Sequence, residues 1–104
     1  MNAQKEIKKL HALMVQSVEA RKDRQSDWEA LGDSLLKLAQ SWAESGNEFL
    51  HIHSRQLETF SDHCHSIHRT DDNYFYYRFA DEVSTNLNNF WFNLWVEDGG
   101  LEDR

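Results

Sequence analysis

The chain has 104 residues, enough for one domain, with no proline and only four glycines. Charged residues make up 28% and aromatic residues 12% of it, and no apolar run approaches about 20 residues, which excludes a disordered chain and a membrane-spanning one. The formal net charge is −7, which disfavours broad binding to nucleic-acid phosphates and suits a basic protein partner.

The first two elements are predicted as helices over residues 2–22 and 27–45. Each has apolar residues at spacings of three and four, which places them on one helix face. The two stripes consist of Ala3, Ile7, Leu10, Met14 and Val18, and of Trp28, Leu31, Leu35, Leu38 and Trp42. Ser26 followed by Glu29 has the form of a capping box, so we expect Ser26 to cap the second helix.

The apolar stripe loses its register near Gly46. We therefore expect Gly46 to end the second helix in a left-handed conformation and Asn47 to cap the third. One helix running through Gly46 is the alternative, because a single glycine costs only about 1 kcal/mol in a helix.

The third and fourth helices are predicted over residues 47–69 and 73–96, separated by a turn rich in N-capping residues. Their stripes consist of Leu50, His53, Leu57, Phe60, Cys64 and Ile67, and of Tyr76, Phe79, Val83, Leu87, Phe90 and Leu94. We expect Tyr74, Tyr76 and Tyr77 to pack at the start of the fourth helix.

Four helices of similar length with short connections predict an all-α, antiparallel four-helix bundle. We expect one helical domain over residues 1–96 and a polar, acidic C-terminal tail over residues 97–104. The N-terminus lacks the apolar segment of a signal peptide, and the single cysteine fits a reducing compartment. The sequence therefore predicts a cytoplasmic protein.

Residues 90–96 place large apolar side chains on more than one face of the fourth helix. One face of a bundle helix cannot bury all of them, and an exposed aromatic patch of this size exceeds what a monomer usually shows. We predict that Trp91, Phe92 and Trp95 contact another chain, as in a homodimer. The alternative is a flat bundle in which the fourth helix is covered on every face.

Five of the six histidines lie between residues 51 and 68. The metal-ligand candidates in this segment are Glu48, His51, Asp62, His65 and His68. His51 and His65 lie about 21 Å apart along a straight helix, so this helix offers at most half a zinc or iron site. An antiparallel second copy would complete it, and solvated or pH-sensing histidines are the other interpretations.

The sequence contains no catalytic motif, phosphate-binding loop or complete metal site. We therefore predict a non-enzymatic, acidic helical protein–protein interaction module, a homodimer of the inhibitor, immunity, accessory or adaptor type with a basic partner. The alternative is a metal-binding bundle that uses the histidine cluster. A third interpretation is a nucleic-acid-associated protein that acts through the basic residues of its first helix.

Overall fold

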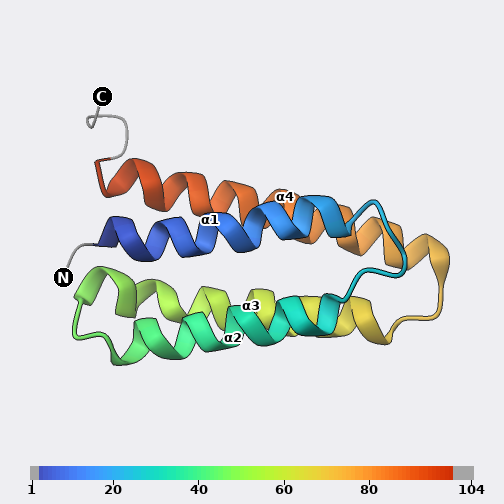
Figure 1. Cartoon of the computed structure of the whole chain (residues 1–104), viewed down its shortest axis with the longest axis horizontal. Coiled ribbons are helices and arrows are strands. Elements are labelled where there is room, and N and C mark those ends of the chain that lie inside the picture. The colour runs from blue at the N-terminus through green and yellow to red at the C-terminus, as the bar shows by residue number, and fades with distance from the viewer. Residues whose placement is uncertain (1–2, 100–104) are drawn as a thin grey trace.

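The computed structural model describes residues 3–99, which form four helices: α1 (Ala3–Ala20), α2 (Trp28–Glu44), α3 (Glu48–Arg69) and α4 (Asn73–Glu97). Consecutive helices run in opposite directions (Figure 1). The predicted antiparallel four-helix bundle is confirmed, and the bounds of α2, α3 and α4 differ by one residue or less from the predicted ones. None of the described helices is long and apolar enough to cross a membrane.

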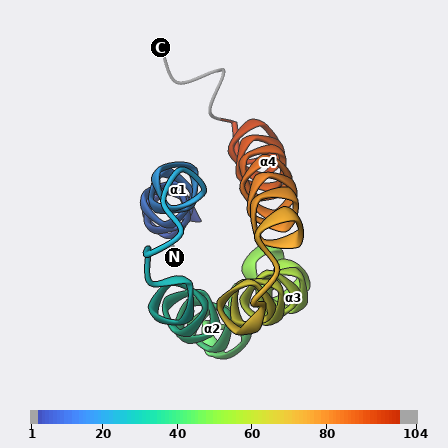
Figure 2. The ribbon, with the colours of Figure 1, turned by 90° about the vertical axis from the view of Figure 1, so that its right-hand side faces the viewer.

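The helices form two closely packed pairs. α2 packs most extensively against α3, and α1 packs against α4, while the contacts of α1 with α2 and of α3 with α4 are looser. The end view shows α2 and α3 side by side, with α1 and α4 on the other side of the molecule (Figure 2). The Cα atoms extend over 42 × 29 × 15 Å, so the bundle is flat, and much of α4 faces outward.

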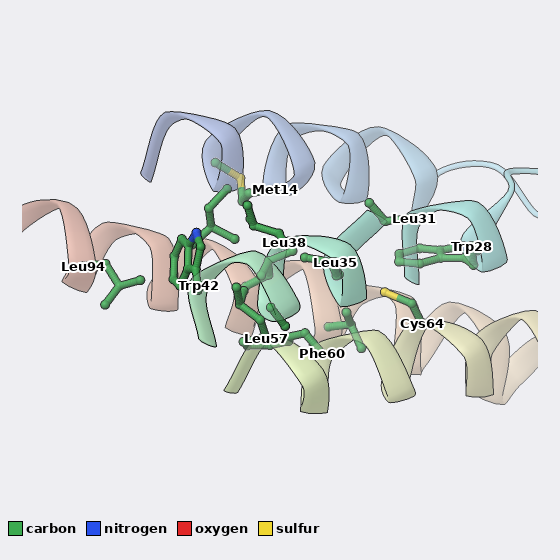
Figure 3. Close-up of a cluster of buried hydrophobic side chains, with 14 of the residues drawn as sticks. Met14, Trp28, Leu31, Leu35, Leu38, Trp42, Leu57, Phe60, Cys64 and Leu94 are labelled. Atoms are coloured by element: carbon green, nitrogen blue, oxygen red, sulfur yellow. The ribbon is translucent and has the colours of Figure 1, made fainter. Parts of the chain in front are cut away.

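The core joins the apolar stripes of all four helices, and those of α2 and α3 form its most closely packed part. Trp28, Leu35 and Trp42 have no exposed area, and the same is true of Leu57 and Cys64 on the facing helix. The two tryptophans lie at opposite ends of this cluster with leucines between them (Figure 3). Each fully buried large apolar side chain contributes about 1.5–3 kcal/mol, so this seam stabilises the fold strongly.

Gly32 allows the close approach of α2 and α3. A Cβ atom at this position would lie 2.7 Å from two atoms of the His65 ring and 3.0 Å from the backbone oxygen of Ser61. The Ser61 hydroxyl donates a hydrogen bond of 2.7 Å to the Gly32 carbonyl. A glycine in the middle of a helix costs about 1 kcal/mol relative to alanine, and here it makes room for the neighbouring helix.

The cap of α2 differs from the prediction. Asp27, not Ser26, is the N-cap, and its carboxylate accepts a hydrogen bond of 2.9 Å from the backbone N–H of Ala30. A carboxylate at this position also interacts favourably with the positive end of the helix dipole, which a serine hydroxyl does much less. The capping box of Ser26 and Glu29 is therefore wrong, and α2 begins at Trp28.

The α2–α3 turn forms as expected. Gly46 has a φ of 77°, a left-handed conformation that glycine adopts without strain. Asn47 caps α3 by accepting a hydrogen bond of 3.2 Å from the backbone N–H of Leu50. The alternative of one continuous helix through Gly46 is wrong.

The first and the last helix end at other residues than predicted. α1 ends at Ala20, because the backbone N–H groups of Lys22 and Asp23 bond three residues back, to Glu19 and Ala20, and tighten into turns. At the other end α4 continues through Glu97 and is followed by Asp98 as its C-cap. The rest of the predicted acidic tail, residues 100–104, lies outside the described residues.

A polar chain joins both connecting segments at the end of the bundle where α2 and α4 begin. Trp28 Nε1 donates to the Tyr76 hydroxyl at 2.8 Å, and this hydroxyl donates to the Asp23 carbonyl at 2.8 Å. Arg24 lies over the Tyr76 ring, 4.2 Å from its centroid, and donates to the Thr70 carbonyl at 3.0 Å. Burial raises the pKa of Tyr76, and the hydrogen bond from Trp28 partly opposes this.

Candidate functional site

The residues of the predicted interface lie together on α4 but differ in exposure. Trp91 and Trp95 are half-buried and stack on each other with ring centroids 6.0 Å apart. The ring of His11 on α1 lies 4.5 Å from that of Trp91. Phe92 is 45% exposed. Trp91 therefore helps to join α4 to α1, and Phe92 is the side chain of the three that is open to another molecule.

The first half of α4 exposes aromatic side chains that were expected to be buried. Phe79, placed on the core stripe by its spacing, is 38% exposed, and Tyr74 and Tyr77 are 67% and 48% exposed. The core position next to Phe79 is taken by the small Ala80, which has no exposed area. The assignment of Phe79 to the core is therefore wrong. Of the three tyrosines, Tyr76 is buried, while Tyr74 and Tyr77 contact the neighbouring rings of Phe75 and Tyr76 and leave much of their own area exposed.

Part of the exposed surface of α4 forms a continuous stripe, which we call the α4 outer face, and the ion pair of Arg78 and Glu82 lies beside it. It consists of Tyr74, Tyr77, Asp81, Thr85, Asn88 and Phe92. These residues follow one another at spacings of three and four, so they share one side of the helix. The stripe carries aromatic side chains at both ends and small polar ones in the middle.

Charge is nearly absent from this stripe. α4 has no charged residue from Val83 to Val96, and Asp81 is paired with Arg21 of α1, whose Nη1 lies 3.1 Å from its carboxylate. The solvent-facing sides of the other helices each carry several charges, namely Lys5, Lys8 and Lys9 on α1, Glu29, Asp33 and Lys37 on α2, and Arg55, Glu58 and Asp62 on α3. A charge-free run in so charged a sequence was the signal that sequence reasoning missed.

The histidines of α3 contact neighbouring elements. His65 Nε2 lies 3.0 Å from an Asp33 carboxylate oxygen, and His68 Nε2 lies 3.4 Å from that of Glu29, both on α2. His51 Nδ1 lies 3.0 Å from the Ala43 carbonyl oxygen. These contacts tie α3 to α2, and the sequence pattern did not reveal them because the partners are distant in the chain.

The predicted metal ligands do not come together within one chain. Glu48 and Asp62 are exposed on α3, whereas His65 and His68 pair with carboxylates of α2 and His51 contacts the Ala43 carbonyl oxygen. Within residues 3–99 there is no group of three His, Cys, Asp or Glu side chains that could hold a metal ion. A zinc or iron site on these residues would have to draw ligands from a second molecule.

Cys64 is fully buried on the core stripe. Burial raises the pKa of its thiol to about 12, so the thiol stays protonated at neutral pH. Because the thiolate is the nucleophilic form, this residue is chemically inert in the folded chain.

The hollows in the surface lie along the looser seams of the bundle. One of about 730 Å³ lies between the end of α1 and the start of α2 and includes Glu19, Asp23 and Asp27 in its lining. A smaller one of about 300 Å³ lies between α3 and α4, beside His63 and Phe79. Both are open to solvent.

The α4 outer face is therefore the surface feature that most distinguishes this chain from an ordinary solvated bundle. No protein-family model, curated protein or solved structure matches the chain. Its function is accordingly inferred from its own residues.

Proposed function

We propose that this chain is a non-enzymatic protein-binding module that contacts its partner through the α4 outer face. The observation that carries this proposal is the run from Val83 to Val96, which is free of charge and contains the exposed Phe92. The exposed Tyr74 and Tyr77 lie earlier on the same stripe. Depletion of charge together with enrichment of aromatic residues is typical of the centre of protein interfaces.

Physical reasons support binding at this surface. An aromatic side chain carries about 150–250 Å² of area, and covering what is exposed here removes apolar surface from water. The amide and hydroxyl groups of Asn88 and Thr85 can exchange hydrogen bonds with water for hydrogen bonds with a partner without the cost of burying a charge. Tyrosine and phenylalanine are rigid, so little side-chain entropy is lost on binding.

The mode of action we propose is occupancy of a surface, as in an adaptor or an inhibitor. The helices pack through a rigid core, so the face is preformed and need not order on binding. The acidic remainder of the chain, with a net charge of −7, attracts basic proteins at long range and suits a second, charged contact elsewhere on the molecule.

Site-specific photo-cross-linking in the native cells tests the proposal. p-Benzoylphenylalanine is introduced in place of Phe92 and, as a matched control, in place of Ile52, an exposed apolar residue of α3 that is 63% accessible. We expect protein adducts from position 92 and none from position 52. Adducts from neither position, or equally from both, would show that α4 has no special part in binding.

A further inference from the structure

We propose that the occupant of the α4 outer face is a second copy of this chain, with the two α4 helices antiparallel about a two-fold axis near Thr85. This inference rests on the proposed function, because it names the partner of the same surface. In this arrangement Tyr77 near the start of one α4 meets Phe92 near the end of the other.

The charge of the chain favours a second copy over a basic partner at this surface. Two copies repel each other, since each carries a net charge of −7, and they can approach closely only where the contact adds no further like charges. The α4 outer face meets this condition, because its single charge, on Asp81, is already paired with Arg21. A basic partner would find no unpaired carboxylate along this stripe to complement its charge.

The order of residues along α4 favours the antiparallel direction. Tyr77 and Phe92 lie about 11 Å from Thr85 on opposite sides, at 1.5 Å per residue. Turning a second helix around Thr85 therefore places Phe92 of one copy near Tyr77 of the other, twice. A two-fold interface must be self-complementary in this way, because the same patch occurs on both copies.

The polar residues of the stripe also fit an antiparallel pair centred near Thr85. Asp81 and Asn88 lie about 5 Å from Thr85 along the axis, again on opposite sides. The antiparallel pair therefore brings the Asn88 amide, a hydrogen-bond donor, beside the Asp81 carboxylate of the other copy. A parallel pair would instead place the two Asp81 carboxylates side by side, which costs free energy.

Sedimentation equilibrium of the purified full chain tests whether it self-associates through this face. Asn88→Asp adds a carboxylate opposite Asp81 without changing side-chain shape, and Asn86→Asp is the matched control, equally exposed on α4 but outside the stripe. We expect the unmodified chain and Asn86→Asp to dimerise alike, and Asn88→Asp to dissociate at least tenfold more readily. Circular dichroism and thermal melting check that all three fold.

Disulfide trapping tests the direction and register. Under mild oxidation, Thr85→Cys is expected to form a covalent dimer, whereas Tyr77→Cys and Phe92→Cys are expected to do so only when the two are mixed. The native Cys64 does not interfere, because it has no exposed area. Cross-linking of Tyr77→Cys with itself at the rate of Thr85→Cys would show a parallel pair and overturn the proposed register.

The two proposals fail differently. A purified chain that stays monomeric at every concentration overturns the second-copy inference, even when position 92 cross-links to a different protein in cells, a result that would preserve the proposed function. If Asn88→Asp and Asn86→Asp weaken the dimer equally, the interface lies elsewhere, and this result also overturns the second-copy inference. Adducts in cells between position 92 and the same chain support both.

Discussion

At the scale of single residues, Tyr76 holds a buried hydrogen-bond chain together. Tyr76→Phe keeps the ring under Arg24 but leaves Trp28 Nε1–H, which has no access to water, without an acceptor. We expect the free energy of unfolding to fall by about 1–3 kcal/mol, the cost of an unsatisfied buried polar group. Chemical denaturation measures this. Tyr77→Phe, at an exposed position, serves as the control and should change stability by well under 1 kcal/mol.

Cys64 makes stability depend on pH in the alkaline range. Its thiol ionises near pH 9 in the unfolded chain and at about 12 in the folded one, so between these values the unfolded state loses a proton that the folded state keeps. Stability must therefore fall as pH rises above 9, by about 1 kcal/mol between pH 8 and pH 10. The raised pKa of Tyr76 acts in the same direction at higher pH.

The control for this pH dependence is Cys64→Ala. The variant starts from a lower stability because it leaves a cavity, but its unfolding free energy should decline less steeply between pH 8 and pH 10. Equal slopes for the two chains would contradict the assignment of the pH effect to the buried thiol.

At the scale of the helices, the α2–α3 pair depends on the absence of a side chain at position 32. Gly32→Ala would gain about 1 kcal/mol of helix propensity, but its Cβ would meet the His65 ring and displace it from Asp33. We expect a net loss of about 1–2 kcal/mol of stability. A double-mutant cycle with His65→Ala measures the coupling, and the loss should shrink by about 1 kcal/mol once the ring is gone.

The spacing of apolar residues was enough to locate all four helices, because burial of a stripe dominates their stability. The spacing correctly predicted that Leu35 and Leu57 are buried, but it was wrong for Phe79. Whether a residue at the edge of an apolar stripe is buried depends on how the neighbouring helices approach, and the spacing does not contain this information. The cap at Asp27 was missed because two adjacent residues can both cap a helix, and hydrogen-bond geometry decides between them.

The candidate site was predicted from the sequence only in part. Sequence alone identified Phe92 as an apolar side chain beyond the capacity of the core, and the structure leaves it exposed. It did not separate Phe92 from the half-buried Trp91 and Trp95, because the contact of Trp91 with His11 joins residues far apart in the chain. The contact between Trp91, Phe92 or Trp95 and another chain stays a prediction.

At the scale of the whole molecule, net charge sets how self-association responds to salt. Two copies of charge −7 repel at low ionic strength, and salt screens this repulsion. We expect the dimer proposed above to dissociate less readily when NaCl is raised from about 0.05 M to about 0.5 M, at constant pH. Light scattering over a concentration series measures this. Weakening by salt would instead indicate that opposite charges hold the copies together.

The division of the bundle into two close pairs has a consequence for the order in which it forms. α2 and α3 are neighbours in the chain, joined by the turn at Gly46, and can meet after closing a very short loop. α1 and α4 come from opposite ends and must wait for the rest of the chain to be placed. The α2–α3 hairpin should therefore form early in folding. In native-state hydrogen exchange, the amides of α1 and α4 should exchange before those of α2 and α3.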